Sequence, residues 1–410
     1  MSTRGILWAT VIASLLLSQT MFAQDSGTCA GMFPGQLANL NGFVPFQGTA
    51  SLWNTNISSA PVDPNSANII AFIGESTTLH PDFGSGLYDG QSMGIPYQVV
   101  GSSPGPVTIT LGAYADESDP GPMPIPSNAL IEGYPSPGGG DAHVLVLNKE
   151  TCWLFELYNA TKTATGWSAN SAAIWDMTTN EYRPYTWTSA DAAGLPIFPG
   201  LVRYDEVAAG AIKHAIRFTV PTTREAFVAP ASHWASSDTS TSTPPMGTRL
   251  RLKASFDVAG FSTANQVILN ALKQYGMILA DNGSAIFITG TPDSRWNNDD
   301  LSNLKTLTGS DFEVVQMSSV YAPSDVPAGP VPTISSFTAS LDAITKGVSI
   351  TLSWDVNWNV STGGYNIISP AVGPVRGTSV VVSPAVTTVY TLYSTNEYGR
   401  ATKTIEIVVH

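Results

Sequence analysis

Short runs in which hydrophobic and polar residues alternate recur along most of the chain, separated by glycine and proline. The clearest runs lie at residues 68–73, 97–100, 106–111, 143–147, 153–158, 201–207, 211–220 and 248–257. Successive side chains of a strand point to opposite faces, so this alternation predicts half-buried strands. The predicted fold class is mostly β: a β-sandwich or jelly-roll main domain with one or two peripheral helices.

Only two segments have the pattern of a helix. Ser262 is a candidate N-cap, Ile268, Leu272 and Tyr275 fall on one helical face, and Gly276 marks the end. A shorter helix is expected from residue 298 to about residue 307. The Pro-rich tract 119–140 predicts a long surface loop.

A second domain is expected after residue 332. Residues 323–332 are rich in proline and have no periodicity, which predicts a stiff linker between a main domain at residues 25–322 and a unit at residues 333–410. This unit resembles the bacterial immunoglobulin-like domains of exported proteins, on the segments Pro332–Phe337, Leu352–Trp354, Val381–Pro384 and Thr387–Leu392. The resemblance implies a seven-strand sandwich that acts as a spacer or adhesive unit, with Trp354 in its core and Tyr390 at a corner.

The N-terminus predicts export. Arg4 precedes a twelve-residue apolar run at residues 6–17, which is too short to span a bilayer but suits a signal peptide. We expect residues 1–23 to be removed by cleavage after Ala23. The mature protein is then secreted, to the periplasm or the extracellular space, and no later run is long enough to predict a membrane span.

Export determines how the two cysteines are interpreted. Cys29 and Cys152 are an even pair in an oxidising compartment, so we expect one disulfide between them.

Composition excludes several function classes. The formal net charge is −13, with 18 Lys+Arg against 31 Asp+Glu, which argues against nucleic acid as a partner. No nucleotide-binding, dinucleotide-binding or zinc-protease motif occurs, so we expect no cofactor. The acidic residues between Asp293 and Asp300 lack the glycine and closing glutamate of an EF-hand loop, so no motif supports a structural calcium ion. Protein partners cannot be predicted.

The candidate catalytic carboxyls are scattered. Asp205 and Glu206 are adjacent, so in a strand at most one of them enters a cleft. Hydrolysis of a glycosidic bond normally needs two carboxyls. Candidates for the second are Asp176, Asp191 and Asp281, although Asp281 also fits an ordinary hairpin turn.

Histidines and basic residues extend this hypothesis. Asp141 and His143 share one face of a predicted strand, where the carboxylate would orient the imidazole. His214 is expected to be half-buried on its strand. The predicted strand 248–257 places Arg249, Arg251 and Lys253 on one face, either as a solvated surface or as the lining of a cleft.

The tryptophans favour a sugar partner, because flat aromatic rings pack against pyranose faces. Trp167, Trp187 and Trp296 are the candidate platforms, with core packing as the alternative for each.

The hypothesis that this composition and domain plan favour is a secreted carbohydrate-active enzyme that degrades a polysaccharide, most simply a glycoside hydrolase with a carboxyl pair. Two alternatives stay open. In a polysaccharide lyase acting on a uronic glycan, the basic row would bind the carboxylates and a histidine would abstract a proton. In a non-catalytic glycan-binding or surface-adhesion protein, the aromatic residues alone would carry the function.

Overall fold

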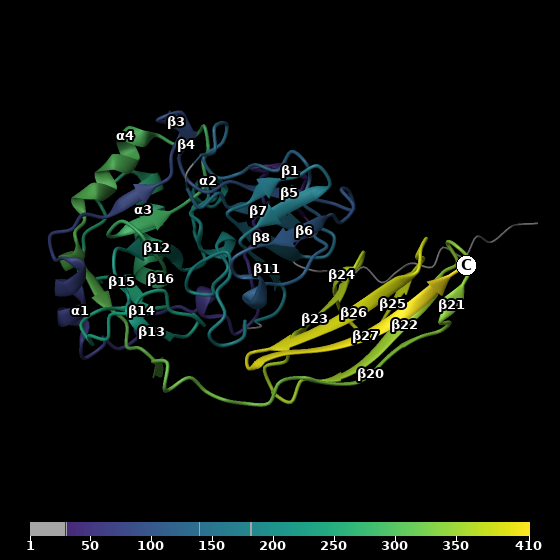
Figure 1. Ribbon diagram of the computed structural model, residues 1–410. Coiled ribbons are helices and arrows are strands. Elements are labelled where there is room, and N and C mark those ends of the chain that lie inside the picture. Colours follow the sequence, from purple (N-terminus) through teal and green to yellow (C-terminus); the bar gives the residue numbers. More distant parts are fainter. Residues whose placement is uncertain (1–28, 30, 139, 181–182) are drawn as a thin grey trace, which may run out of the picture.

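The computed structural model describes residues 29, 31–138, 140–180 and 183–410. The chain is mostly β, with 34% strand and 12% helix, which confirms the predicted class. Figure 1 shows a broad main body with an elongated unit beside it. The predicted signal peptide lies outside the described residues. Within them, no helix is long and apolar enough to cross a membrane.

A five-stranded sheet forms one half of the main body. Its central strands β7 and β8 are hydrophobic on both faces, and both faces are buried. A small sheet flanks it. The five strands, in sheet order, are β1 (Gly35–Gln36), β5 (Tyr97–Val100), β7 (Val144–Asn148), β8 (Trp153–Tyr158) and β11 (Ser171–Asp176). The flanking sheet contains β6 (Thr108–Leu111), β10 (Gly166–Ala169) and β9 (Thr161–Lys162).

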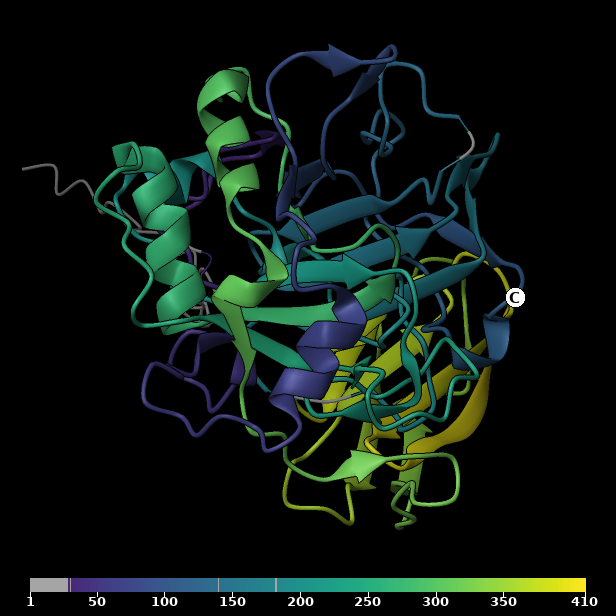
Figure 2. The same ribbon diagram turned by 90° about the vertical axis from the view of Figure 1, so that its left-hand side faces the viewer.

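A mixed six-stranded sheet forms the other half. Helix α3 (Thr263–Gln274) connects two of its strands, and Ser262 caps the helix by accepting a hydrogen bond from the Asn265 amide, as predicted. Figures 1 and 2 show α3, α1 (Ser66–Ile73) and α4 (Asn298–Leu301) together on this side of the molecule. The strands, in sheet order, are β18 (Phe312–Val314), β15 (Arg249–Leu252), β16 (Met277–Asn282), β12 (Ile216–Val220), β17 (Phe287–Thr289) and β2 (His80–Asp82).

Smaller elements complete the main body. A third sheet contains β14 (Pro245–Met246), β13 (Arg224–Val228) and β19 (Val320–Tyr321), and β3 (Leu87–Tyr88) pairs with β4 (Gln91–Ser92) in a hairpin. Helix α2 spans Tyr204–Ala208. Short 3₁₀ helices span Leu52–Asn54, Ala115–Glu117, Phe198–Gly200, Ser302–Thr306 and Gly309–Asp311.

The C-terminal unit is a two-sheet sandwich. Its own core contains Trp354 and Tyr390, 4% and 2% exposed. It has eight strands, one more than the resemblance implied. One sheet contains β20 (Thr333–Ala339), β22 (Ile350–Asn357) and β25 (Ser379–Val382). The other contains β21 (Ala343–Ile344), β27 (Gly399–Val409), β26 (Thr388–Asn396), β23 (Tyr365–Ser369) and β24 (Gly373–Val375).

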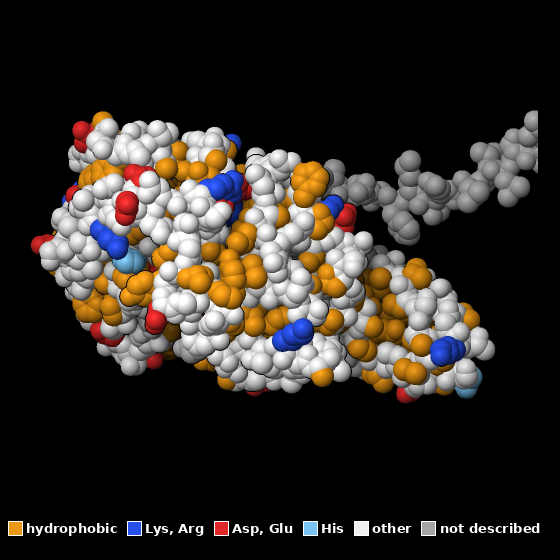
Figure 3. All heavy atoms as spheres, turned by 90° about the horizontal axis from the view of Figure 1, so that it is seen from above, with side chains coloured by type: hydrophobic (Ala, Val, Ile, Leu, Met, Phe, Trp, Pro, Cys, Tyr) orange, Lys and Arg blue, Asp and Glu red, His pale blue; other side chains and the backbone are white. Residues whose placement is uncertain are grey.

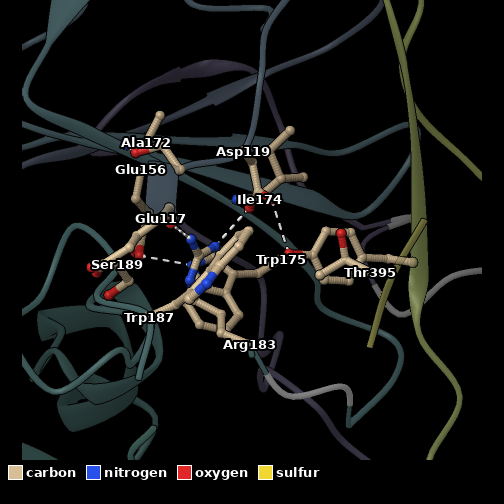
Figure 4. A network of polar contacts seen from close by, with 12 residues as sticks. Glu117, Asp119, Glu156, Ala172, Ile174, Trp175, Arg183, Trp187, Ser189 and Thr395 are labelled. Atoms are coloured by element: carbon tan, nitrogen blue, oxygen red, sulfur yellow. Dashed lines mark hydrogen bonds and ion pairs between the residues drawn. The ribbon is translucent and has the colours of Figure 1, made fainter. Parts of the chain in front are cut away.

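A fully buried carboxylate joins the two units (Figure 4). Asp119 binds Arg183 of the main body at 2.7 Å, and Arg400 of the C-terminal unit at 2.5 Å. It also accepts a hydrogen bond of 2.9 Å from the hydroxyl of Tyr365. Tyr365 and Ile367 pack into a hydrophobic cluster of the main body. The C-terminal unit is therefore docked by a shared core and a shared charge network.

The predicted disulfide is confirmed. Cys29 and Cys152 are bonded, with 5.6 Å between their Cα atoms and 123 residues between them in sequence. Both are buried, and the bond ties the first described residue to the turn between β7 and β8.

Several local predictions were wrong. Residues 68–73 and 201–207 alternate like strands but contribute to helices α1 and α2, because their hydrophobic residues also fit a helical face. The predicted strand 248–257 ends at Leu252, where a turn begins. The tract 119–140 was expected at the surface, yet it begins with the fully buried Asp119.

Candidate functional site

A row of polar and aromatic side chains crosses one face of the six-stranded sheet. In the strand register, Asp281 of β16 lies opposite Thr219 of β12, Thr219 opposite Phe287 of β17, and Phe287 opposite His80 of β2. Register partners point to the same face of a sheet. The opposite face carries Phe218 and other fully buried residues, which belong to the main hydrophobic core.

Arg217 lies on the same face and holds several of these groups together. Its Nε and one terminal nitrogen bind the two carboxylate oxygens of Asp191, each at 2.7 Å. The same terminal nitrogen contacts Asp281 at 3.2 Å, and the other donates to the hydroxyl of Thr289 at 2.9 Å. Asp191 and Arg217 are 1% and 4% exposed. A bidentate pair with this degree of burial fixes both side chains.

Asp281 is the protonatable group of the cluster. The pKa of Asp281 is raised to about 7, mainly by burial. The nearby Asp191 carboxylate also raises this pKa, by more than Arg217 lowers it. Asp141 adds to the same repulsion. Its side chain is still 21% exposed, so substrate and solvent can reach it. A carboxyl with these properties is suited to general acid catalysis near neutral pH.

His143 is a buried cation rather than a base. Burial opposes its charge, but the Glu132 carboxylate outweighs burial and raises the His143 pKa to about 9. Nδ1 donates to Glu132 at 2.7 Å and Nε2 donates to the carbonyl of Ala190 at 2.9 Å. Glu132 therefore orients the ring, where the sequence had suggested Asp141. Both nitrogens are occupied, so the imidazolium positions the segment around Ala190.

These groups surround a pocket of about 240 Å³ where the loops of the two large sheets meet. Asp281 comes from the end of β16, Tyr158 from the end of β8, and Asp141 from the segment before β7. The ring of Tyr114 lies 6.4 Å from that of Tyr158, and Tyr114 is 44% exposed. The remaining lining includes Asp191, His233 and Asn282. Three of the sequence candidates thus line the pocket, Asp141, Asp191 and Asp281, and His143 lies behind its wall at Ala190.

A larger pocket of about 510 Å³ lies at the other end of the polar row. Its lining includes His80 and Phe287, whose rings stack with their centroids 4.0 Å apart. Asp82, on the same strand as His80, also lines it. Burial and then the Glu132 carboxylate raise the pKa of Asp82, which places Asp82 in the electrostatic field of the cluster around Arg217.

The other predicted catalytic residues form a separate cluster. Glu206 binds Arg203 at 2.5 Å and His214 at 3.2 Å, and all three side chains are buried. Asp205 accepts a hydrogen bond from the Leu40 amide. Asp205 and Glu206 lie on helix α2 rather than on a strand, so the alternation argument does not apply to them. Their contacts are those of a structural ion-pair network.

The remaining sequence candidate, Asp176, is also used structurally. It holds Arg376 of the C-terminal unit through two hydrogen bonds of 2.6 and 2.7 Å.

The three basic residues of the predicted strand 248–257 anchor loops. Arg249 donates to the carbonyls of Leu52, Thr55 and Tyr275. Arg251 binds Glu313 and the carbonyls of Ile57 and Ala60, and Lys253 donates to the carbonyl of Ser310. The guanidinium donors are occupied by backbone oxygens and the Glu313 carboxylate, and the two arginines hold the loop around residues 52–60 against β15. None of the three lines either pocket described above.

The tryptophan candidates are core residues. Trp167 and Trp296 are 2% and 5% exposed, so neither presents a ring face to a ligand. Trp187 is partly buried between the guanidinium groups of Arg183 and Arg400, at 5.7 and 4.6 Å from its centroid. The aromatic rings that do line the two pockets belong to tyrosines, phenylalanines and histidines.

Sequence reasoning missed Arg217, Glu132 and Asp82 as members of the site. One signal was available for Arg217, because an arginine inside the hydrophobic run of β12 requires a buried partner. Glu132 lies in the Pro-rich tract, where no periodicity indicates its direction.

Among the described residues, no group of three or more His, Cys, Asp or Glu side chains is arranged to hold a metal ion. Comparisons of the chain with protein-family models, with curated proteins and with solved structures found no match. The site is therefore interpreted from its own geometry.

Proposed function

We propose that the protein is a secreted glycoside hydrolase in which Asp281 donates the proton and Asp141 supplies the second carboxyl. The observation that carries the proposal is a carboxyl with a pKa of about 7 that lines a 240 Å³ pocket together with a solvent-exposed carboxyl. Two carboxyls in different environments are the groups that cleavage of a glycosidic bond requires.

The lining of the pocket supports a sugar as the ligand. Tyr114 and Tyr158 offer ring faces against which the C–H groups of a pyranose pack. Asn282 and His233 offer polar groups for hydroxyls. An apolar wall with a few directed polar groups is typical of small-molecule sites.

The reaction follows from these positions. Asp281 transfers its proton to the glycosidic oxygen, so that the leaving group departs as an alcohol. Asp141 either takes a proton from an attacking water or attacks the anomeric carbon directly. Direct attack forms a glycosyl ester on Asp141, which a water then hydrolyses while Asp281, now a carboxylate, takes the proton of that water. The first route gives inversion of configuration and the second gives retention. The Arg217–Asp191 pair fixes the wall behind Asp281, and the Asp191 carboxylate adds to the effect of burial in raising the Asp281 pKa.

The lyase alternative has less support. A lyase needs a neutral base beside the sugar, whereas His143 is held as an imidazolium with both nitrogens occupied. The basic residues assigned to the uronate carboxylates anchor loops instead. The glycan-binding alternative remains as the outcome expected if no bond is cleaved.

Release of reducing ends from a panel of plant and microbial polysaccharides tests the proposal. We expect hydrolysis of at least one substrate and a loss of roughly 10²-fold or more in kcat for Asp281→Asn and for Asp141→Asn. Asp299→Asn is the matched control, because Asp299 is an exposed carboxyl on α4 that does not line the pocket. Full activity of Asp281→Asn excludes its role as the acid. Binding of a glycan without cleavage supports the non-catalytic alternative.

Secretion is part of the same proposal. The buried disulfide fits an oxidising compartment. Expression of the full chain in a bacterial host with an intact export system, followed by N-terminal sequencing of the exported protein, tests it. We expect a mature chain that begins at Gln24. Retention of uncleaved protein in the cytoplasm contradicts export.

A further inference from the structure

We infer that the 510 Å³ pocket is a remote sugar-binding subsite of the same active site, so that the enzyme acts on an extended neutral glycan laid across the strands of the sheet. The inference rests on the proposed function for its catalytic end. It depends on the position of the second pocket, the chemistry of its walls and the charges that lie along the sheet between the two pockets.

The two pockets lie at the two ends of one register row. Asp281 lines the first pocket, and Phe287 and His80 line the second. The row Asp281–Thr219–Phe287–His80 crosses four neighbouring strands on one face. With about 4.8 Å between strands, its ends lie about 14 Å apart. That span exceeds one sugar ring, so a ligand that reaches both pockets must be an oligosaccharide.

The second pocket has the composition of a sugar subsite. The rings of His80 and Phe287 stack face to face, inclined by only 12° to each other, and both line the pocket. Burial, and then the charge of Lys305, lower the pKa of His80, so the imidazole is neutral at pH 7. Asp82 and Asn298 provide hydrogen-bonding groups beside it. Flat rings with adjacent carboxyl and amide groups suit the C–H face and the hydroxyls of a pyranose.

Only a short turn separates the two pockets. The connection from β16 to β17 passes the end of β12 and contains Gly283, Ser284 and Ala285. Ser284 is exposed, and its carbonyl accepts the hydroxyl of Thr219 at 2.8 Å, which holds the turn close to the sheet. The turn carries only small side chains, so a glycan chain can cross it.

The charge along the row favours a neutral glycan. Arg217 is paired with Asp191, and the His143 cation is paired with Glu132. Four carboxyls line the two pockets, Asp82, Asp141, Asp191 and Asp281, against a single lysine, Lys305. The whole chain also carries a net charge of −13. A polyuronate is repelled by this field, whereas a neutral chain is not.

Substitution of Phe287 tests the subsite. We expect Phe287→Ala to lower kcat/KM for a neutral hexasaccharide by roughly tenfold, as removal of a central aromatic contact commonly does. It should leave kcat/KM for the matching disaccharide nearly unchanged. Phe287→Trp retains a flat ring and should restore kcat/KM for the hexasaccharide. Phe72→Ala, which removes an exposed aromatic ring from α1, is the matched control. Thermal unfolding verifies that each variant is folded.

A second variant addresses the crossing point. Ser284→Trp places a bulky ring on the turn between the pockets. It should lower kcat/KM for the hexasaccharide and leave kcat/KM for the disaccharide nearly unchanged. Equal losses for short and long substrates in Phe287→Ala overturn the subsite while leaving the hydrolase proposal intact. Hydrolysis of polygalacturonate in preference to all neutral glycans overturns the neutral-chain inference.

Binding measurements separate the two proposals further. If the wild-type protein cleaves no glycan, titration calorimetry with neutral hexasaccharides still tests the subsite. We then expect binding to the wild type that Phe287→Ala weakens. Equal binding by both proteins, or no binding by either, overturns the subsite.

Discussion

Arg217 binds Asp191 through two parallel hydrogen bonds of 2.7 Å and leaves Asp281 only a single contact at 3.2 Å. This unequal sharing explains why two carboxyls beside one guanidinium differ in role. Asp191 is fully paired and buried. Asp281 experiences burial and the negative charge of Asp191 with little compensation, which raises its pKa to about 7.

Removal of the Asp191 charge should therefore lower the pKa of Asp281. A group that acts as a general acid is active only while protonated, so wild-type activity should fall as the pH rises through about 7. In Asp191→Asn the repulsion disappears and Arg217 turns more fully to Asp281. We expect the basic limb of the pH–kcat/KM profile to move to lower pH by on the order of one unit.

The pH profiles of the wild type, Asp191→Asn and the control Asp299→Asn check this prediction. The control should retain the wild-type limb. An unchanged limb in Asp191→Asn means that Asp281 is not the titrating acid.

The His143–Glu132 pair makes stability depend on pH in the basic range. The His143 pKa is raised from about 6.5 to about 9, so the folded state binds a proton that the unfolded state loses. The stabilisation is fully present below pH 6.5 and is lost as the pH rises through 9. The shift corresponds to on the order of 3 kcal/mol.

Denaturant unfolding between pH 6 and pH 10 measures this loss. In His143→Gln the slope between pH 7 and pH 9 should become shallower, because the substituted side chain binds no proton and only the upper ends of the Asp281 and Glu156 titrations, near pH 7, remain. His233→Gln is the control, since His233 is only partly buried and is hydrogen-bonded to a single carbonyl, that of Ala192. A slope that persists in His143→Gln assigns the pH dependence to another group.

The sequence predicted the elements better than it predicted the site. Strand alternation identified β8, β12 and the sandwich of residues 333–410, and the cysteine count predicted the disulfide. Local pattern failed for Asn68–Ile73, because five apolar residues in six fit a buried strand and a helical face equally well. Helix α1 instead forms where it covers β18.

The site depends on contacts between segments far apart in sequence. Asp141, Asp191 and Asp281 come together only because β7, β12 and β16 bring their ends to one place, and no spacing in the sequence encodes that. Glu206 and His214 lie only eight residues apart, and each was a separate candidate for catalysis in the sequence. Their local contact with Arg203 makes them structural. Proximity in sequence was therefore a misleading guide to chemistry.

The disulfide should stabilise the fold substantially, since it closes a loop of 123 residues. In the chain-entropy model this closure contributes about 4–5 kcal/mol. The double variant Cys29→Ser/Cys152→Ser should lose most of that free energy of unfolding in denaturant titrations. Thiol titration of the unfolded, unreduced protein should find no free thiol. Two free thiols in protein purified from an oxidising compartment contradict the bond.

Asp119 should be the residue on which docking of the C-terminal unit depends most. From the sequence, residues beyond about 330 were expected to be removable without loss of fold or activity. In the structure, deleting these residues removes Arg400 and Tyr365, which bind the fully buried Asp119 carboxylate. It also removes Tyr365 and Ile367 from the hydrophobic cluster that they share with the main body. We therefore expect residues 24–330 alone to unfold at lower denaturant concentration and without a sharp transition.

Asp119→Asn tests the same network with one substitution. It leaves Arg183 and Arg400 buried without a charged partner, which costs about 3–5 kcal/mol for a buried pair. The loss should extend to activity, because Arg183 also donates to the carbonyl of Thr188, at the start of the segment that forms one wall of the pocket around Asp281. Asp116→Asn, at an exposed carboxyl three residues away, should have no effect on either. A truncated main body that unfolds cooperatively at the wild-type midpoint would show that the two units are independent after all.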